Sequence, residues 1–198
     1  MRNIWKGWIA EVAENRYFVG KLLLAMPAMQ DPRFERAVIY MCAHSAEGAM
    51  GLVINQINSG ISFPGLLEQL DIETRRPIAD IAVHTGGPVE MGRGFVLHSA
   101  DYVQESTLIV SETMALTATV DILRAIAEGH GPKSSILALG YAGWGPGQLD
   151  AEIRANGWLI AEADSELIFY TNNSLKWPRA MAKLGIDISM LSSDAGHA

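Results

Sequence analysis

The sequence has one cysteine, Cys42, among 198 residues. A single thiol excludes an internal disulfide framework and a cysteine-rich zinc site, and it is typical of a protein kept in a reducing compartment. No stretch offers the roughly 18 consecutive apolar residues of a membrane span. Glu11 and Glu14 lie where a signal peptide would need an apolar core. We therefore expect a cytoplasmic protein without a membrane span.

Positive charge is also scarce, because 15 Lys and Arg face 22 Asp and Glu, for a formal net charge of -7. This balance disfavours broad contact with a phosphate backbone, which depends on clustered cations. No basic recognition helix is evident either. Apolar residues make up 49% of the chain and charged residues 19%, which indicates one globular domain rather than disorder.

Apolar runs alternate with turn-rich breaks, and the early strands are joined by connections too short for helical crossovers. This pattern predicts an α+β fold with a mostly antiparallel sheet. Helices are predicted over 63–70, 120–128, 146–155 and 178–184, the last two with Pro146 and Pro178 in their first turns. Strands are predicted over 17–24, 37–43, 50–55, 81–84, 94–99, 107–110, 135–141, 158–161 and 167–170.

Residues 1–19 form an accessory segment ahead of a single domain at 20–198. Within the segment, Ile4, Trp5, Trp8, Ile9 and Val12 recur at helical spacing and would form one apolar stripe. The near-balanced charges of the segment argue against an anionic membrane surface. We therefore expect an amphipathic helix that docks on protein.

Two glycine-rich segments, TGGPVEMGRG and GYAGWGPG, match neither a Walker loop nor a dinucleotide fingerprint. We interpret their glycines as residues that allow positive φ and close backbone approach. Loops on a rigid sheet are where binding residues concentrate. The predicted binding residues come from three loops and one strand end: Met26, Pro27, Thr85, Gly86, Gly87, Pro88, His98, Tyr141, Gly143 and Trp144.

Cys42 and His44 are the candidate catalytic residues. Two residues apart on a strand, they would share a face, although about 6–7 Å apart, and a histidine can activate a thiol. Convergence of His44, His84 and His98 with Cys42 would make a polar cluster or a metal site. The alternative, a buried thiol and histidines satisfied by backbone, is favoured. Neither a cofactor nor a metal is predicted.

A charged loop, DPRFER at 31–36, precedes the second predicted strand. Arg33 and Arg36 could hold an anion there. More often such cations pair with nearby carboxylates, here Asp31 and Glu35, with little net effect on stability.

Several separated blocks resemble the YqgE/AlgH family of bacterial proteins: GKLLLAMPAMQDPRFERAVIYMCAHSAEGAMGLVIN, TGGPVEMGRGFVLHS, LGYAGWGPGQLDAEIRANGWL and AKLGIDI with the closing AGHA. Their order makes the resemblance specific from Gly20 to the C-terminus, while the segment before Gly20 is longer than the family core needs. The resemblance implies an α+β fold whose split, barrel-like sheet is surrounded by helices. It also implies the label of transcriptional regulator that AlgH members carry, with no catalytic residue to transfer.

Three functions remain in view. The first is a non-enzymatic binding or regulatory protein that acts through a protein or small-molecule partner. The second is a thiol-dependent enzyme or redox sensor that uses Cys42 and His44. The third is a direct DNA-binding regulator, ranked last, for which we expect no sequence-specific complex at physiological salt. The sequence gives neither the partner nor the oligomeric state.

Overall fold

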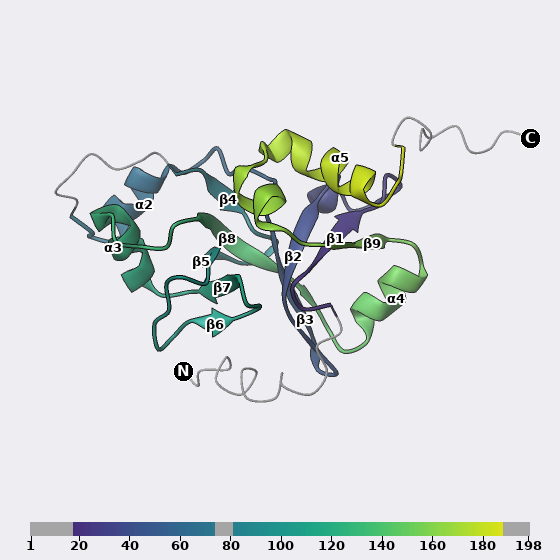
Figure 1. Cartoon of the computed structure of the whole chain (residues 1–198), viewed down its shortest axis with the longest axis horizontal. Helices are drawn as coiled ribbons and strands as arrows, with labels where there is room; N and C mark the ends of the chain where they lie inside the picture. Colours follow the sequence, from purple (N-terminus) through teal and green to yellow (C-terminus); the bar gives the residue numbers. More distant parts are fainter. Residues whose placement is uncertain (1–17, 74–80, 188–198) are drawn as a thin grey trace, which may run out of the picture.

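The computed structural model describes residues 18–73 and 81–187. The predicted N-terminal helix lies outside these residues. Within them, nine strands form one curled sheet in the order β6-β7-β5-β8-β3-β2-β1-β9, and β4 pairs with β8 off this path (Figure 1). The strands are β1 (Lys21–Ala25), β2 (Val38–Ser45), β3 (Gly48–Val53), β4 (Val83–Thr85), β5 (Val89–Ser99), β6 (Leu108–Ile109), β7 (Met114–Thr117), β8 (Ser135–Trp144) and β9 (Trp158–Glu162).

The α+β class and the mostly antiparallel sheet are confirmed, since every strand pairing is antiparallel except that of β4 with β8. The predicted strands over 37–43 and 50–55 pair as an antiparallel hairpin, β2–β3, whose turn at Ala46 and Glu47 is shorter than the loop between the two predicted ranges. Strand β7 was not predicted. Among the described residues, no helix is long and apolar enough to cross a membrane.

Strand β8 joins the two halves of the sheet. One edge of β8 pairs with β5, and the other pairs first with β4 and then with β3. The β4–β5 connection, Gly86 to Pro88, must therefore cross the backbone of β8. It does so closely: a Cβ on Gly86 would lie 2.2 Å from the oxygen of Gly140, and a Cβ on Gly87 would lie 2.1 Å from the carbonyl carbon of Tyr141. Glycine is required here because a side chain has no room.

Three groups of buried side chains fill the two sides of the curled sheet. The inner group includes Tyr40, Phe95 and Trp177 and joins both halves of the sheet to the C-terminal helix. A second group lies between the outer face of β1–β3 and helix α4. A third lies under α2 and α3 on the outer face of the other half.

The helices cover patches of the sheet rather than surround it, so that part of the family-based expectation is wrong. Figure 1 shows α2 and α3 grouped at one end of the molecule, α4 at the other end and α5 across the top between them. Met91 on β5 is 66% exposed and Ile109 on β6 is 43% exposed. The helices are α2 (Phe63–Gln69), α3 (Val120–Glu128), α4 (Gln148–Arg154) and α5 (Asn173–Lys183), with a single 3-10 turn, η1, at Pro32–Phe34.

Two predictions near the C-terminus are wrong. Residues 167–170 are not a strand but part of a π-helical turn, η2 (Glu166–Tyr170), closed by a bond from Thr171 N to Glu166 O. Short apolar runs do not distinguish a strand from a buried helical turn. Helix α5 begins at Asn173, capped by the Asn172 side chain, so Pro178 lies inside the helix rather than in its first turn.

We predict that Gly87→Ala lowers the free energy of unfolding by at least about 2 kcal/mol. The new Cβ would meet the backbone of Tyr141, and the φ of +151° at Gly87 is one that alanine rarely adopts. Gly92→Ala is the matched control, because Gly92 is exposed and a Cβ there meets nothing within 4 Å. Urea unfolding measures the free energy of unfolding of both variants. If Gly87→Ala were as stable as Gly92→Ala, the close approach of the β4–β5 connection to β8 would be contradicted.

Candidate functional site

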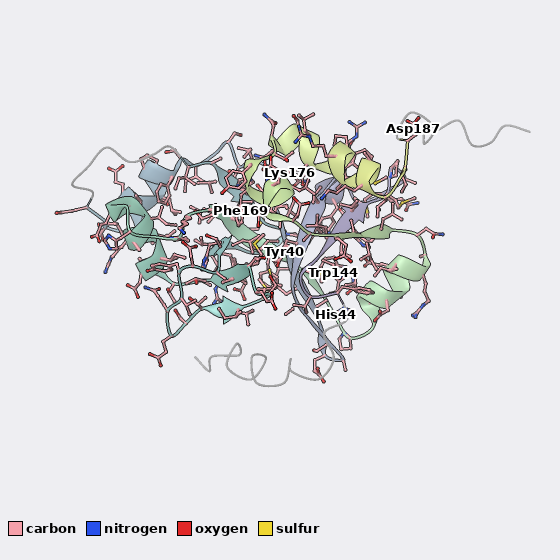
Figure 2. The ribbon with its side chains drawn as sticks, viewed as in Figure 1. Tyr40, His44, Trp144, Phe169, Lys176 and Asp187 are labelled. Atoms are coloured by element: carbon pink, nitrogen blue, oxygen red, sulfur yellow. The ribbon has the colours of Figure 1, made fainter. Side chains whose placement is uncertain are left out.

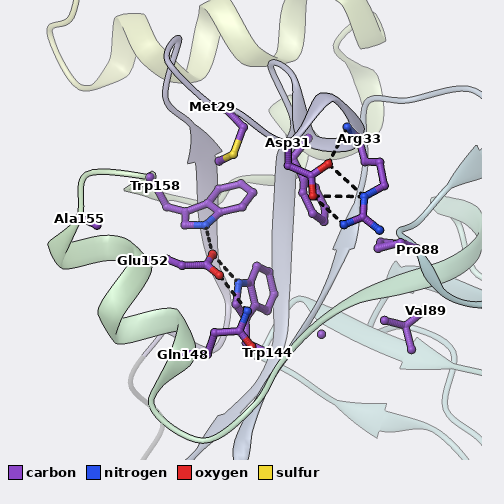
Figure 3. Close-up of a pocket in the computed structure, with 13 residues that line it drawn as sticks. Met29, Asp31, Arg33, Pro88, Val89, Trp144, Gln148, Glu152, Ala155 and Trp158 are labelled. Carbon is purple, nitrogen blue, oxygen red and sulfur yellow. Dashed lines mark hydrogen bonds and ion pairs between the residues drawn. The ribbon is translucent and has the colours of Figure 1, made fainter.

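A pocket of about 460 Å³ opens on the outer face of the β1–β3 half, between helix α4 and the loop that joins β1 to β2 (Figure 3). The start of β5 and the end of β8 complete its wall. Its size is in the range of small-molecule sites. The lining residues are Met29, Asp31, Arg33, Phe34, Pro88, Val89, Gly143, Trp144, Gln148, Glu152, Ala155, Gly157 and Trp158.

The carboxylate of Glu152 holds two tryptophans in place. Trp144 Nε1 donates a hydrogen bond of 3.0 Å to Glu152 Oε2, and Trp158 Nε1 donates one of 2.7 Å to the same oxygen. The two rings meet edge to face at 5.9 Å between centroids. Gln148, one helical turn earlier, donates to Glu152 Oε1 over 2.9 Å. These bonds, all within the protein, hold the two rings in one arrangement and form an aromatic wall.

An ion pair forms another part of the wall. Asp31 caps the 3-10 turn η1 by accepting from Arg33 N over 3.0 Å. The same carboxylate accepts from the Arg33 guanidinium over 3.0 Å and 2.7 Å. The Arg33 bond holds the pKa of Asp31 below its usual value. Of the two interpretations of this loop, the structure therefore shows Arg33 paired with Asp31.

The predicted binding residues separate into three groups. Pro88, Gly143 and Trp144 line the pocket. Met26 borders it, since Met26 N donates to the oxygen of Gly157, and Pro27 follows on the exposed loop. The other five lie outside the lining: Thr85, Gly86 and Gly87 belong to the crossing over β8, Tyr141 packs edge to face on Phe95, and His98 is fully buried in the other half of the sheet.

The expectation that Cys42 and His44 share a face of β2 is wrong. The β2–β3 register shifts between Met41 and Ala43, so a β-bulge interrupts the alternation of side chains. Cys42 therefore packs in the inner core. His44 pairs with Ala49, a member of the outer core, and its ring stacks on Phe18 at 5.2 Å.

Each of the two residues is held in its own surroundings. Burial raises the pKa of the Cys42 thiol to about 12. The thiol donates to the oxygen of Tyr40 over 3.6 Å. His44 Nε2 lies 3.9 Å from the carboxylate of Asp150 on α4, and burial lowers the pKa of His44. Figure 2 shows His44 near the tip of the β2–β3 hairpin, with Tyr40 further along β2.

His84 and His98 do not join Cys42 in one cluster. Both nitrogens of His98 are hydrogen-bonded, to the oxygen of Ser99 and to Thr117 Oγ1. His84 contacts Asn173 on α5, beside the buried Lys176, whose pKa burial lowers to about 8. Over residues 18–73 and 81–187, no group of three His, Cys, Asp or Glu side chains could hold a metal ion.

Sequence reasoning missed Glu152 and Trp158, the residues that shape the pocket most. Their pattern was present: Gln148 and Glu152 are four residues apart on a predicted helix, so they share a face. Tryptophans 144 and 158 stand at either end of that helix. The contact between the three side chains depends on how α4 packs on the sheet, which the pattern does not specify.

Comparison with known proteins agrees with the fold and the motifs. A family model described as AlgH-like matches residues 22–189. A UPF0301 protein of Bradyrhizobium diazoefficiens is 56% identical over 190 residues, covering 92% of this chain and 89% of the relative. Another, of Rhodospirillum rubrum, is 57% identical over 182 residues, covering 92% and 95%.

Solved structures extend the comparison. The solution structure of the AlgH protein from Pseudomonas aeruginosa is 43% identical, with a TM-score of 0.75, and covers 92% of this chain and 96% of its own. A crystal structure of a Corynebacterium diphtheriae protein has the same fold, with a TM-score of 0.70 at 21% identity over 90% and 93% of the two chains. The chain thus belongs to the AlgH-like family, as its motifs indicated.

We predict that Glu152→Ala lowers the free energy of unfolding by about 2–4 kcal/mol, because two indole N–H groups lose a charged acceptor. Glu162→Ala is the matched control. Glu162 pairs with Lys21 on the surface, and such exposed pairs contribute at most about 1 kcal/mol. Urea unfolding compares the two variants. Equal, small losses would show that Glu152 does not hold the tryptophans.

For Cys42 we predict slow alkylation in the native protein at neutral pH and rapid alkylation in denaturant. The raised pKa keeps the thiol protonated, and burial hides it from the reagent. Cys42→Ala should lose about 1 kcal/mol of stability and keep near-wild-type partner binding. Fast labelling of the native protein, with an apparent pKa well below about 8.5, would instead favour the thiol-dependent function.

Proposed function

We propose that this AlgH-like protein is a non-enzymatic binding and regulatory protein whose partner engages the pocket between α4 and the β1–β2 loop. The observation that carries the proposal is the aromatic wall that Glu152 fixes through its hydrogen bonds to Trp144 and Trp158. A preformed, mostly apolar pocket with a few placed polar groups is typical of a binding site.

The composition of the lining favours binding over catalysis. Among the described residues, those that line the pocket include no cysteine, serine, threonine, lysine or histidine, the usual nucleophiles and bases. Its two carboxylates are engaged, that of Asp31 with Arg33 and that of Glu152 with indole N–H groups. The thiol-dependent alternative gains no support from Cys42, which packs in the inner core away from this face.

Regulation through a bound partner is easier to reconcile with the chain than direct DNA binding. The net charge of -7 opposes contact with a phosphate backbone. The transcriptional-regulator role implied by the family label would then be indirect. We propose the cytoplasm as its location, which the single cysteine of the sequence supports.

A pocket-filling variant tests the proposal. Ala155 is exposed at the C-terminal end of α4 and lines the pocket, so Ala155→Trp should fill it without disturbing the core. Ala182→Trp places the same side chain on the exposed side of α5, outside the lining. Both variants should unfold at near-wild-type urea concentrations.

The measurement compares what each variant captures from a cell extract, with bound proteins and small molecules identified by mass spectrometry. We expect the wild type and Ala182→Trp to capture the same specific partner in equal amounts. Ala155→Trp should capture at least tenfold less of it. Retention of every captured species by Ala155→Trp would overturn the pocket as the binding site.

A further inference from the structure

The charges around the pocket do not cancel. Three of its lining residues carry formal charge: Asp31, Arg33 and Glu152. Arg33 and Asp31 neutralise each other through a bidentate pair. Glu152 accepts hydrogen bonds from neutral donors, two indoles and one amide. Among the described residues it has no cationic partner, so the pocket wall carries one excess negative charge.

The Glu152 carboxylate also has room for another donor. An ionised carboxylate offers about four lone-pair sites. Trp144 and Trp158 use two on Oε2, and Gln148 uses one on Oε1. One site therefore remains on a side chain that lines the pocket. A cationic N–H donor would fill it and neutralise the excess charge in one contact.

The rest of the wall suits an apolar body. Trp144 and Trp158 are 7% and 3% exposed, so each presents only a small part of its ring to the pocket, and Phe34 meets Trp158 edge to face at 5.5 Å. Met29 and Val89 add aliphatic surface. Aromatic rings attract cations as well as apolar groups, most strongly when water is displaced. The excess negative charge at Glu152 and the apolar wall thus both favour a ligand with a cationic group on an apolar body.

We propose that the pocket binds a small organic cation: an ammonium group, placed at Glu152, on an aromatic or alkyl body that packs against Trp144, Trp158 and Phe34. This deepens the proposed function and rests on it. A small molecule is the chosen occupant because a pocket of about 460 Å³ matches a molecule of that size.

An anionic ligand is the alternative, and the charges of the residues that line the pocket disfavour it. Among the described residues that line the pocket, Arg33 is the one cation, and Asp31 pairs with its Nε and Nη2 and compensates its charge. An anion would reach only the remaining N–H groups of a neutral pair and would have to approach the uncompensated charge of Glu152. The structure therefore favours a cation over an anion of the same size.

Three probes with similar bodies and different charges test the inference: phenethylamine, 2-phenylethanol and 3-phenylpropionate. Titration into the wild-type protein is followed by calorimetry and by the indole N–H signals of Trp144 and Trp158, assigned with Trp144→Phe and Trp158→Phe. We expect phenethylamine to bind at least about tenfold more tightly than the alcohol and the carboxylate to bind weakest. Added salt should weaken the binding of the amine most.

A variant that removes the charge of Glu152 provides the second part of the test. Glu152→Gln should abolish the preference for the cation, so that phenethylamine and 2-phenylethanol bind this variant with affinities within about twofold of each other. Glu162→Gln makes the same change at the exposed Lys21 pair and should alter neither. The wild-type comparison of the three probes stands even if Glu152→Gln fails to fold.

The outcomes separate this inference from the proposed function. Equal binding of amine and alcohol, or tighter binding of the carboxylate, would overturn the cation while leaving the pocket as a binding site. Failure of all three probes to bind, or binding of a lysine-containing peptide alone, would also overturn the small-cation assignment. The proposed function is judged separately, by the loss of the captured partner in Ala155→Trp.

Discussion

The fold depends on the crossing of the β4–β5 connection over β8, where the two backbones lie too close together for a side chain. Gly86 N donates to the oxygen of Leu139, and Gly86 O accepts from Val53 N. The connection is thus bonded to β8, which it crosses, and to the neighbouring strand β3. Because a Cβ on Gly87 would lie 2.1 Å from the backbone of Tyr141, the approach is possible only without side chains. Strand β8, which joins the two halves of the sheet, therefore runs directly against this connection.

The pocket follows from the crossing. Beyond it, the chain enters β5 at Pro88 and Val89, while β8 continues to Gly143 and Trp144, and all four residues line the pocket. Strand β8 then leads into α4, which returns Gln148 and Glu152 to the same wall. The carboxylate of Glu152 joins the end of β8 to the start of β9 through the two indoles. The backbone around the crossing positions the residues of the pocket wall, and the carboxylate of Glu152 holds the two tryptophans in place.

The sequence predicted the elements better than the site. Apolar runs located β2 and β3, and the helix predicted over 120–128 has the bounds of α3, which Gly129 ends with a φ of +80°. Period-2 alternation failed at Cys42, because a bulge depends on the pairing of two strands and not on either strand alone. Glycines 86 and 87 were interpreted correctly as residues of close approach, whereas the role of Glu152 depends on tertiary packing.

The central claim is that Glu152 holds the aromatic wall in place without a ligand, and hydrogen exchange of the indole N–H groups tests it most directly. In the ligand-free protein, the Trp144 and Trp158 N–H groups should exchange slowly. In Glu152→Gln both should exchange much faster, while the Trp177 N–H, bonded to the oxygen of Ala25 over 2.9 Å, should stay protected. Rapid exchange of Trp144 and Trp158 in the wild type would contradict a preformed pocket.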